Sequence, residues 1–135
     1  MDSPRLSQIL IVEDNEIDSD LLMRQMAHAQ IEDHVRVIQD GREALDVLYT
    51  MPLPPMAIFL DLSLRGMSGI ELLRKLKEHP RLKEIPVFIL TGSVDPRHFE
   101  ECTRLGVTAY LSKPINLITF IKTVAHLYPR LSGVK

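Results

Sequence analysis

The chain has 135 residues, of which 45% are hydrophobic and 25% charged, and its net charge is −2. This is the length of one domain, and so many apolar side chains form a core without disulfides or a structural metal. The slightly acidic balance argues against a general nucleic-acid binder, the single cysteine excludes a disulfide framework or a CxxC pair, and no apolar run is long enough to span a membrane.

Five apolar segments are typical of strands, and each is followed by a segment with helical spacing. The first strand is expected over residues 6–12 and the first helix over residues 17–30. The apolar residues of this helix that we expect on one inward face are Ile17, Leu21, Leu22, Met26 and Ala29. The later strands are expected over residues 34–38, 56–60, 86–90 and 107–111. The later helices are expected over residues 41–49, 68–78 and 95–104, with a last helix that begins at Asn116.

This alternation predicts an α/β fold, in which helices cover both faces of a parallel sheet. The strands at 6–12, 56–60 and 86–90 are almost continuously apolar, which favours central positions, whereas those at 34–38 and 107–111 have the mixed texture of edges. Right-handed crossovers then favour a doubly wound five-stranded sheet of order 2-1-3-4-5, the flavodoxin-like (βα)5 arrangement. The winding reverses between the first and third strands, so a site is expected at their carboxyl ends.

Polar side chains follow four of the five strands. Glu13 and Asp14 follow the first strand, Asp61 the third, Thr91 the fourth and Lys113 the fifth. Two carboxylates about 4 Å apart repel by roughly 4 kcal/mol at an effective dielectric near 20, so the cluster calls for Lys113 and a divalent cation. A ligand set made only of oxygen suits Mg²⁺. Such a site can neutralise a phosphoryl group in transfer, with Asp61 as the nucleophile that becomes an acyl phosphate.

The segments LIVEDN, FLDLSLRGMSGIELL, VFILTGS and AYLSKP resemble the receiver domain of two-component response regulators, over about residues 6–128. The resemblance implies that Asp61 accepts a phosphoryl group from a histidine kinase or a histidine phosphotransfer protein. It implies that Glu13, Asp14 and Asp61 hold Mg²⁺, with the backbone carbonyl of Ser63 as a further ligand.

The resemblance also implies a switch. Thr91 and Lys113 would contact the phosphoryl oxygens, and Tyr110 would be the aromatic side chain that rotates when Thr91 turns inward. The fourth helix offers only Phe99 and Cys102 as inward apolar residues, so we expect it to be the mobile element. The output face toward a protein target would combine this helix with the fifth strand and the fifth helix.

The whole chain, residues 1–135, is expected to be one receiver domain, with residues 129–135 as a tail and no output domain. It would be a cytoplasmic monomer or weak homodimer that docks to a protein, with no membrane or nucleic-acid partner. Two other functions stay open: a receiver-like binding module that is never phosphorylated, and a phosphohydrolase with an aspartate nucleophile. The second resembles haloacid-dehalogenase-like phosphatases, which typically carry an aspartate where Ser63 stands.

Overall fold

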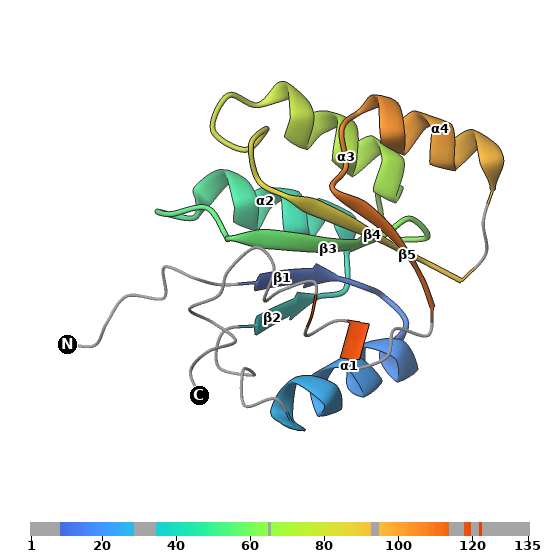
Figure 1. The fold of residues 1–135 in the computed structure, drawn as a ribbon. Coiled ribbons are helices and arrows are strands. Elements are labelled where there is room, and N and C mark those ends of the chain that lie inside the picture. Colours follow the sequence, from blue (N-terminus) through green and yellow to red (C-terminus); the bar gives the residue numbers. More distant parts are fainter. Residues whose placement is uncertain are drawn as a thin grey trace.

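A computed structural model describes residues 9–28, 35–64, 66–92 and 95–113, together with residues 118, 119 and 122. Strands and helices alternate along this part of the chain (Figure 1). The strands are β1 (Ile9–Val12), β2 (Val35–Ile38), β3 (Ala57–Asp61), β4 (Val87–Thr91) and β5 (Ala109–Ser112). The helices are α1 (Glu16–His28), α2 (Gly41–Thr50), α3 (Gly69–Glu78) and α4 (Pro96–Arg104).

The strands form one parallel sheet in the order β2-β1-β3-β4-β5, which confirms the predicted doubly wound α/β fold. The three central strands are buried along their length or nearly so, whereas β2 and β5 contain partly exposed residues, as expected of edges. Val12 pairs with Leu60, and Thr91 pairs with Ser112. This register brings the carboxyl ends of the strands to one rim.

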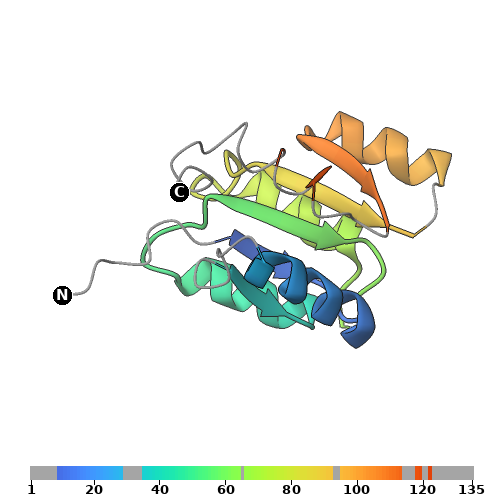
Figure 2. The same ribbon diagram turned by 60° about the horizontal axis from the view of Figure 1, so that its bottom comes forward.

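Two apolar layers hold the sheet between helices. On one face, Leu10, Ile58 and Ile89 pack against residues of α2 and α3 and against Cys102 of α4. On the other face, Phe59 and Phe88 stack 4.8 Å apart, in the cluster that holds Leu22 and Met26 of α1. Figure 1 shows α2, α3 and α4 above the sheet with α1 below it, and in Figure 2 α1 lies in front. Burial of both sheet faces is the main force that fixes this arrangement.

Most predicted boundaries lie within two residues of the observed ones, and the differences matter at the rim. Asp61 and Thr91 are the last residues of β3 and β4, not the first residues of loops. Their backbones are therefore fixed by the hydrogen bonds of the sheet. At the other end of the last strand, β5 begins at Ala109, two residues later than expected.

Three side chains predicted to face inward do not. Ile17 is 79% exposed and Leu21 is 42% exposed, because the inward stripe of α1 is formed by Ser19, Leu22 and Met26. At about 100° per residue, that stripe turns Ile17 and Leu21 away from the sheet.

In α4, Phe99 is 47% exposed and meets Tyr110 edge-on, with ring centroids 5.2 Å apart. Only Cys102 of this helix is buried. The prediction that Phe99 points into the core is therefore wrong, and its ring packs at the rim of β5 instead.

The chain before Ile9, and with it the expected start of the first strand, lies outside the described residues, as does Ala29. Of the expected last helix, residues 118, 119 and 122 are described and are helical; the rest of it and the tail fall outside. None of the helices in the described ranges has the length and apolar character that a membrane span needs.

Candidate functional site

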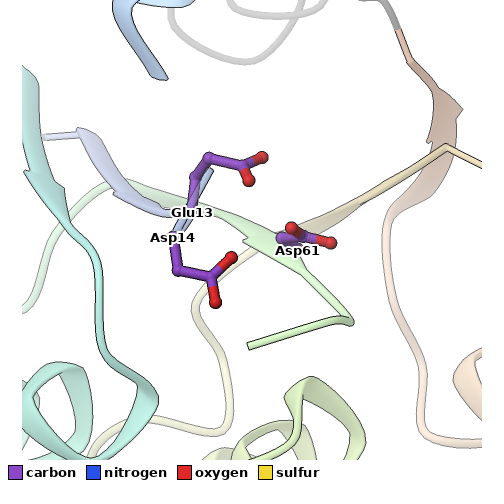
Figure 3. Close-up of side chains that lie close together, drawn as sticks. All are labelled: Glu13, Asp14 and Asp61. Carbon is purple, nitrogen blue, oxygen red and sulfur yellow. The ribbon is translucent and has the colours of Figure 1, made fainter. Parts of the chain in front are cut away.

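Three carboxylates meet at the carboxyl ends of β1 and β3. Glu13 and Asp14 directly follow β1, and Asp61 ends β3 beside them (Figure 3). One oxygen of each carboxylate lies within 4.8 Å of the other two. The close approach follows from the pairing of Val12 with Leu60, which sets the next residue of each strand side by side.

Backbone amides orient two of these carboxylates. The Glu13 side chain accepts a hydrogen bond from the amide of Asn15 at 3.1 Å, and the Asp61 side chain accepts one from the amide of Ser63 at 3.0 Å. The bond from Ser63 occupies Oδ1 of Asp61. The Ser63 side chain is exposed, and the role of its carbonyl as a metal ligand stays a prediction.

A glycine sets the position of the β3 end. The amide of Gly69, at the start of α3, donates to the carbonyl of Leu62 at 3.0 Å. A Cβ at Gly69 would lie 2.5 Å from both the Asp61 carbonyl oxygen and the Leu62 Cα, a distance that real Cβ contacts essentially never show. The helix can approach the Asp61 backbone this closely only because residue 69 has no side chain.

The ammonium of Lys113 lies among the carboxylates. Its Nζ is 2.6 Å from Oε1 of Glu13 and 3.2 Å from Oδ2 of Asp61. Its own backbone amide donates to the carbonyl of Thr91 at 2.7 Å, which extends the pairing of β4 with β5 by one residue. The structure thus brings together the four predicted residues Glu13, Asp14, Asp61 and Lys113.

A third carboxylate on Lys113 was not foreseen. Oδ2 of Asp18, in the first turn of α1, lies 3.0 Å from the same Nζ. The signal was available, because Asp18 lies in the first turn of a helix that begins shortly after the first strand ends, close to the rim of the sheet. The prediction of the site relied on residues that directly follow strand ends, and Asp18 lies within a helix.

The carboxylates of Glu13, Asp14 and Asp61 form an acidic pocket in which Lys113 supplies one positive charge. Burial is the largest cause that raises the pKa of Glu13 to about 7; Asp61 also raises it, whereas Lys113 lowers it. For Lys113, burial acts to lower the pKa, but the ion pairs with Glu13 and Asp18 and the charge of Asp61 outweigh it and raise the pKa. The pocket therefore holds its ammonium charged and favours a proton or a cation beside Glu13.

Thr91 and Tyr110 lie next to the pocket, toward α4. Thr91 is buried, and the hydroxyl of Tyr110 is also buried although its ring is partly exposed. Burial is the largest cause that raises the pKa of Tyr110, Cys102 raises it further, and the Thr91 side chain acts in the opposite direction. The hydroxyl thus lies inward, and the partly exposed ring packs against the core cluster that contains Cys102.

The donor set fits a divalent cation. The carboxylates of Glu13, Asp14 and Asp61 offer oxygen only, and no histidine or cysteine belongs to this cluster. One ammonium cannot balance three carboxylates beside it, so a hard cation would relieve the remaining repulsion.

Comparison with known proteins points the same way. The family model of the response regulator receiver domain matches residues 9–125. Response regulator Rcp1 from Synechocystis is 35% identical over 121 residues, which cover 86% of this chain and 82% of Rcp1.

Solved structures of similar sequence share the fold. The bacteriophytochrome response regulator AtBRR is 34% identical with a TM-score of 0.79, over 92% of this chain and 94% of AtBRR. The phosphorylated cyanobacterial phytochrome response regulator RcpA and the Mn(2+)-bound form of Rcp1 are each 31% identical, with a TM-score of 0.74. The alignment covers 95% of this chain in both cases, with 90% of RcpA and 91% of Rcp1. On the match of the family model over most of its length, the chain belongs to the response regulator receiver domain family.

Proposed function

We propose that this protein is a receiver that is phosphorylated on Asp61 in a Mg²⁺-dependent manner. The observation that carries the proposal is the position of the Lys113 ammonium, 3.2 Å from Asp61 Oδ2 within a cluster of three carboxylates. An acid that serves only to cap a loop needs neither a buried ammonium nor two further acids beside it.

The chemistry is the transfer of one phosphoryl group. A carboxylate oxygen of Asp61 attacks phosphorus, a new O–P bond forms, and the bond from phosphorus to the donor's imidazole nitrogen breaks with its electron pair. The product is an acyl phosphate on Asp61, and the donor histidine leaves in its neutral form after taking up a proton. Lys113 and Thr91 would donate hydrogen bonds to the phosphoryl oxygens and stabilise the charge that they carry.

Glu13, Asp14 and Asp61, with the backbone carbonyl of Ser63, would hold the cation. When bound, Mg²⁺ supplies positive charge to the phosphoryl oxygens and to the carboxylate that accepts them. The Mn(2+)-bound form of Rcp1 supports a divalent cation in this kind of domain, and phosphorylated RcpA supports phosphorylation.

The signal would pass through Thr91 and Tyr110 to the face formed by α4, β5 and the expected fifth helix. The inward position of the Tyr110 hydroxyl next to Thr91 supports this route. The partner that reads this face would be a protein, and the donor a histidine kinase or a histidine phosphotransfer protein. The similar proteins RcpA and AtBRR are phytochrome response regulators, so a phytochrome-type kinase is the first donor to test. We propose that residues 1–135 act as one domain in the cytoplasm, as a monomer or weak homodimer.

Incubation with acetyl phosphate and Mg²⁺, followed by intact mass measurement, tests the proposal. The wild type should gain one phosphoryl group, and Asp61→Asn should gain none. Asp46→Asn removes an exposed acid of α2 and should behave as wild type.

Each other outcome points to another class. Continuous turnover of a phosphomonoester would indicate a phosphohydrolase. No mass gain with acetyl phosphate or with a histidine kinase would overturn the proposal in favour of a module that binds without phosphorylation.

A further inference from the structure

Among the described residues, Asp18 is the one carboxylate on Lys113 that does not belong to the candidate metal cluster. Its Oδ2 lies 3.0 Å from Nζ, closer than that of Asp61 at 3.2 Å. The three carboxylates that could share a cation within the described ranges are Glu13, Asp14 and Asp61. A cation bound there would draw on Glu13 and Asp61, the other two partners of Lys113, and leave Asp18 to the ammonium.

A helix cap also fixes the backbone of Asp18. Its backbone amide donates to Oδ1 of Asn15 at 3.0 Å, which makes Asn15 the N-cap of α1 and places Asp18 at the third helical position. A carboxylate in the first turn is stabilised by the helix dipole. The helix cap thus fixes the Asp18 backbone, and its carboxylate lies beside Lys113 with the Asp18 side chain 36% exposed against 15% for Lys113.

We propose that Asp18 is a positioning residue for Lys113, which keeps the ammonium at the phosphoryl site throughout the cycle. This inference rests on the function proposed above. The ammonium donates hydrogen bonds to Asp18 and Asp61 and forms an ion pair with Glu13. On phosphorylation, Lys113 exchanges the bond to Asp61 for one to a phosphoryl oxygen, while the bond to Asp18 persists and sets the direction of the stem. Without Asp18, the flexible four-carbon stem has to be ordered in each phosphorylation event.

The test compares three single variants in their reaction with acetyl phosphate and Mg²⁺. Asp18→Ala removes the acceptor and should slow phosphorylation about tenfold, a loss of the size expected when a positioned group becomes mobile. Asp18→Asn keeps an oxygen at the same position and should stay within about threefold of the wild type. Asp20→Ala is the matched control, because it removes the same charge from an exposed position of the same helix and should react as wild type.

A second measurement reports on Lys113 itself, without metal or phosphoryl donor. The ¹⁵Nζ ammonium signal should be visible by NMR in the wild type, in Asp18→Asn and in Asp20→Ala, because its protons are bonded and exchange slowly. Asp18→Ala should broaden this signal beyond detection, and Lys113→Arg identifies it. Circular dichroism checks that every variant is folded.

Two results would overturn the inference. One is an Asp18→Ala protein that reacts at the rate of Asp20→Ala and keeps the Lys113 signal. The other is an Asp18→Asn protein as slow as Asp18→Ala, which would assign the effect to charge and not to position. If the wild type gains no phosphoryl group, the proposed function fails, and the NMR comparison still decides whether Asp18 holds Lys113.

Discussion

Asp61 and Lys113 are separated by 52 positions in the sequence, and yet Oδ2 of the first lies 3.2 Å from Nζ of the second. The parallel sheet produces this contact, because β3 and β5 flank β4 and all three end at one rim. The pair places the carboxylate that we propose as the phosphoryl acceptor beside a positive charge. It also leaves more carboxylates in the pocket than one ammonium can balance, and several of the expected outcomes below follow from this excess.

Replacement of Asp14 by Asn should stabilise the metal-free protein. It removes one of three clustered carboxylates, and the relief of repulsion should raise the free energy of unfolding by about 1 kcal/mol. We expect Mg²⁺ to stabilise the wild type, and the same change should remove that stabilisation. Urea unfolding in EDTA and in Mg²⁺ measures both effects, and a destabilised Asp14→Asn protein in EDTA would contradict the repulsion.

The affinity for Mg²⁺ should fall in acid. Because burial raises the pKa of Glu13 to about 7, this group carries a proton below that pH, and a cation has to displace it. For one group with that pKa, the Kd should rise about tenfold between pH 8 and pH 6. Titration calorimetry at both pH values measures the change. Glu13→Gln has no proton to lose, so its Kd should change far less over the same range.

Gly69→Ala should displace the backbone of Asp61, although Gly69 is not itself a residue of the site. The new Cβ would lie 2.5 Å from the Asp61 carbonyl oxygen and the Leu62 Cα, so the backbone has to move. We expect a loss of about 2 kcal/mol in the free energy of unfolding, together with slower phosphorylation by acetyl phosphate. Gly92→Ala is the matched control, since a Cβ there meets nothing within 4 Å. Equal stability of the two variants would show that the end of β3 tolerates displacement.

The ion pair between Arg74 of α3 and Glu101 of α4 should limit the motion of α4. Arg74 Nε donates to Glu101 at 2.8 Å, and Nη2 contacts the same carboxylate oxygen. Because Cys102 is the only buried residue of α4, we expect this pair to help hold the helix against α3. Arg74→Ala should therefore speed amide hydrogen exchange in residues 96–104 severalfold, with little effect on global stability.

A matched substitution within α4 tests whether the contact with α3 is responsible. Arg97 is paired only with Asp95 of its own helix cap, at 3.5 Å, among the described residues, and it is largely exposed. Arg97→Ala should leave exchange in α4 close to that of the wild type. The same acceleration in both variants would mean that loss of charge, and not loss of the α3 contact, loosens the helix.

The fold and the centre of the site were predictable because they depend on patterns that topology makes unambiguous. Continuously apolar strands have to lie in the middle of the sheet, and parallel pairing then brings Glu13, Asp61 and Lys113 to one rim whatever their separation in sequence. Residues whose role depends on the direction of a side chain were harder. Ile17 looked like a core residue because the exposed and buried sides of α1 are both partly apolar.

The roles of Asp18 and Gly69 were not predicted from the sequence, for a different reason. Their importance depends on what approaches them from elsewhere in the chain: Lys113 reaches Asp18 from β5, and Gly69 is pressed against the backbone of β3. Such approaches depend on distances of a few ångströms between elements. The order of the strands does not determine those distances.

The amide of Lys113 donates a hydrogen bond to the carbonyl of Thr91, and β5 is an edge strand whose neighbour in the sheet is β4. If β5 separates from β4, Lys113 moves away from Asp61 and Tyr110 moves away from Phe99 of α4 at the same time. In that state, the residue proposed to bind the phosphoryl group and the residue proposed to transmit the signal would be displaced together. A ligand that binds the free edge of β5 and holds it against β4 should therefore favour the arrangement of Lys113 and Tyr110 described here. It would do so without contact to the carboxylates of the site.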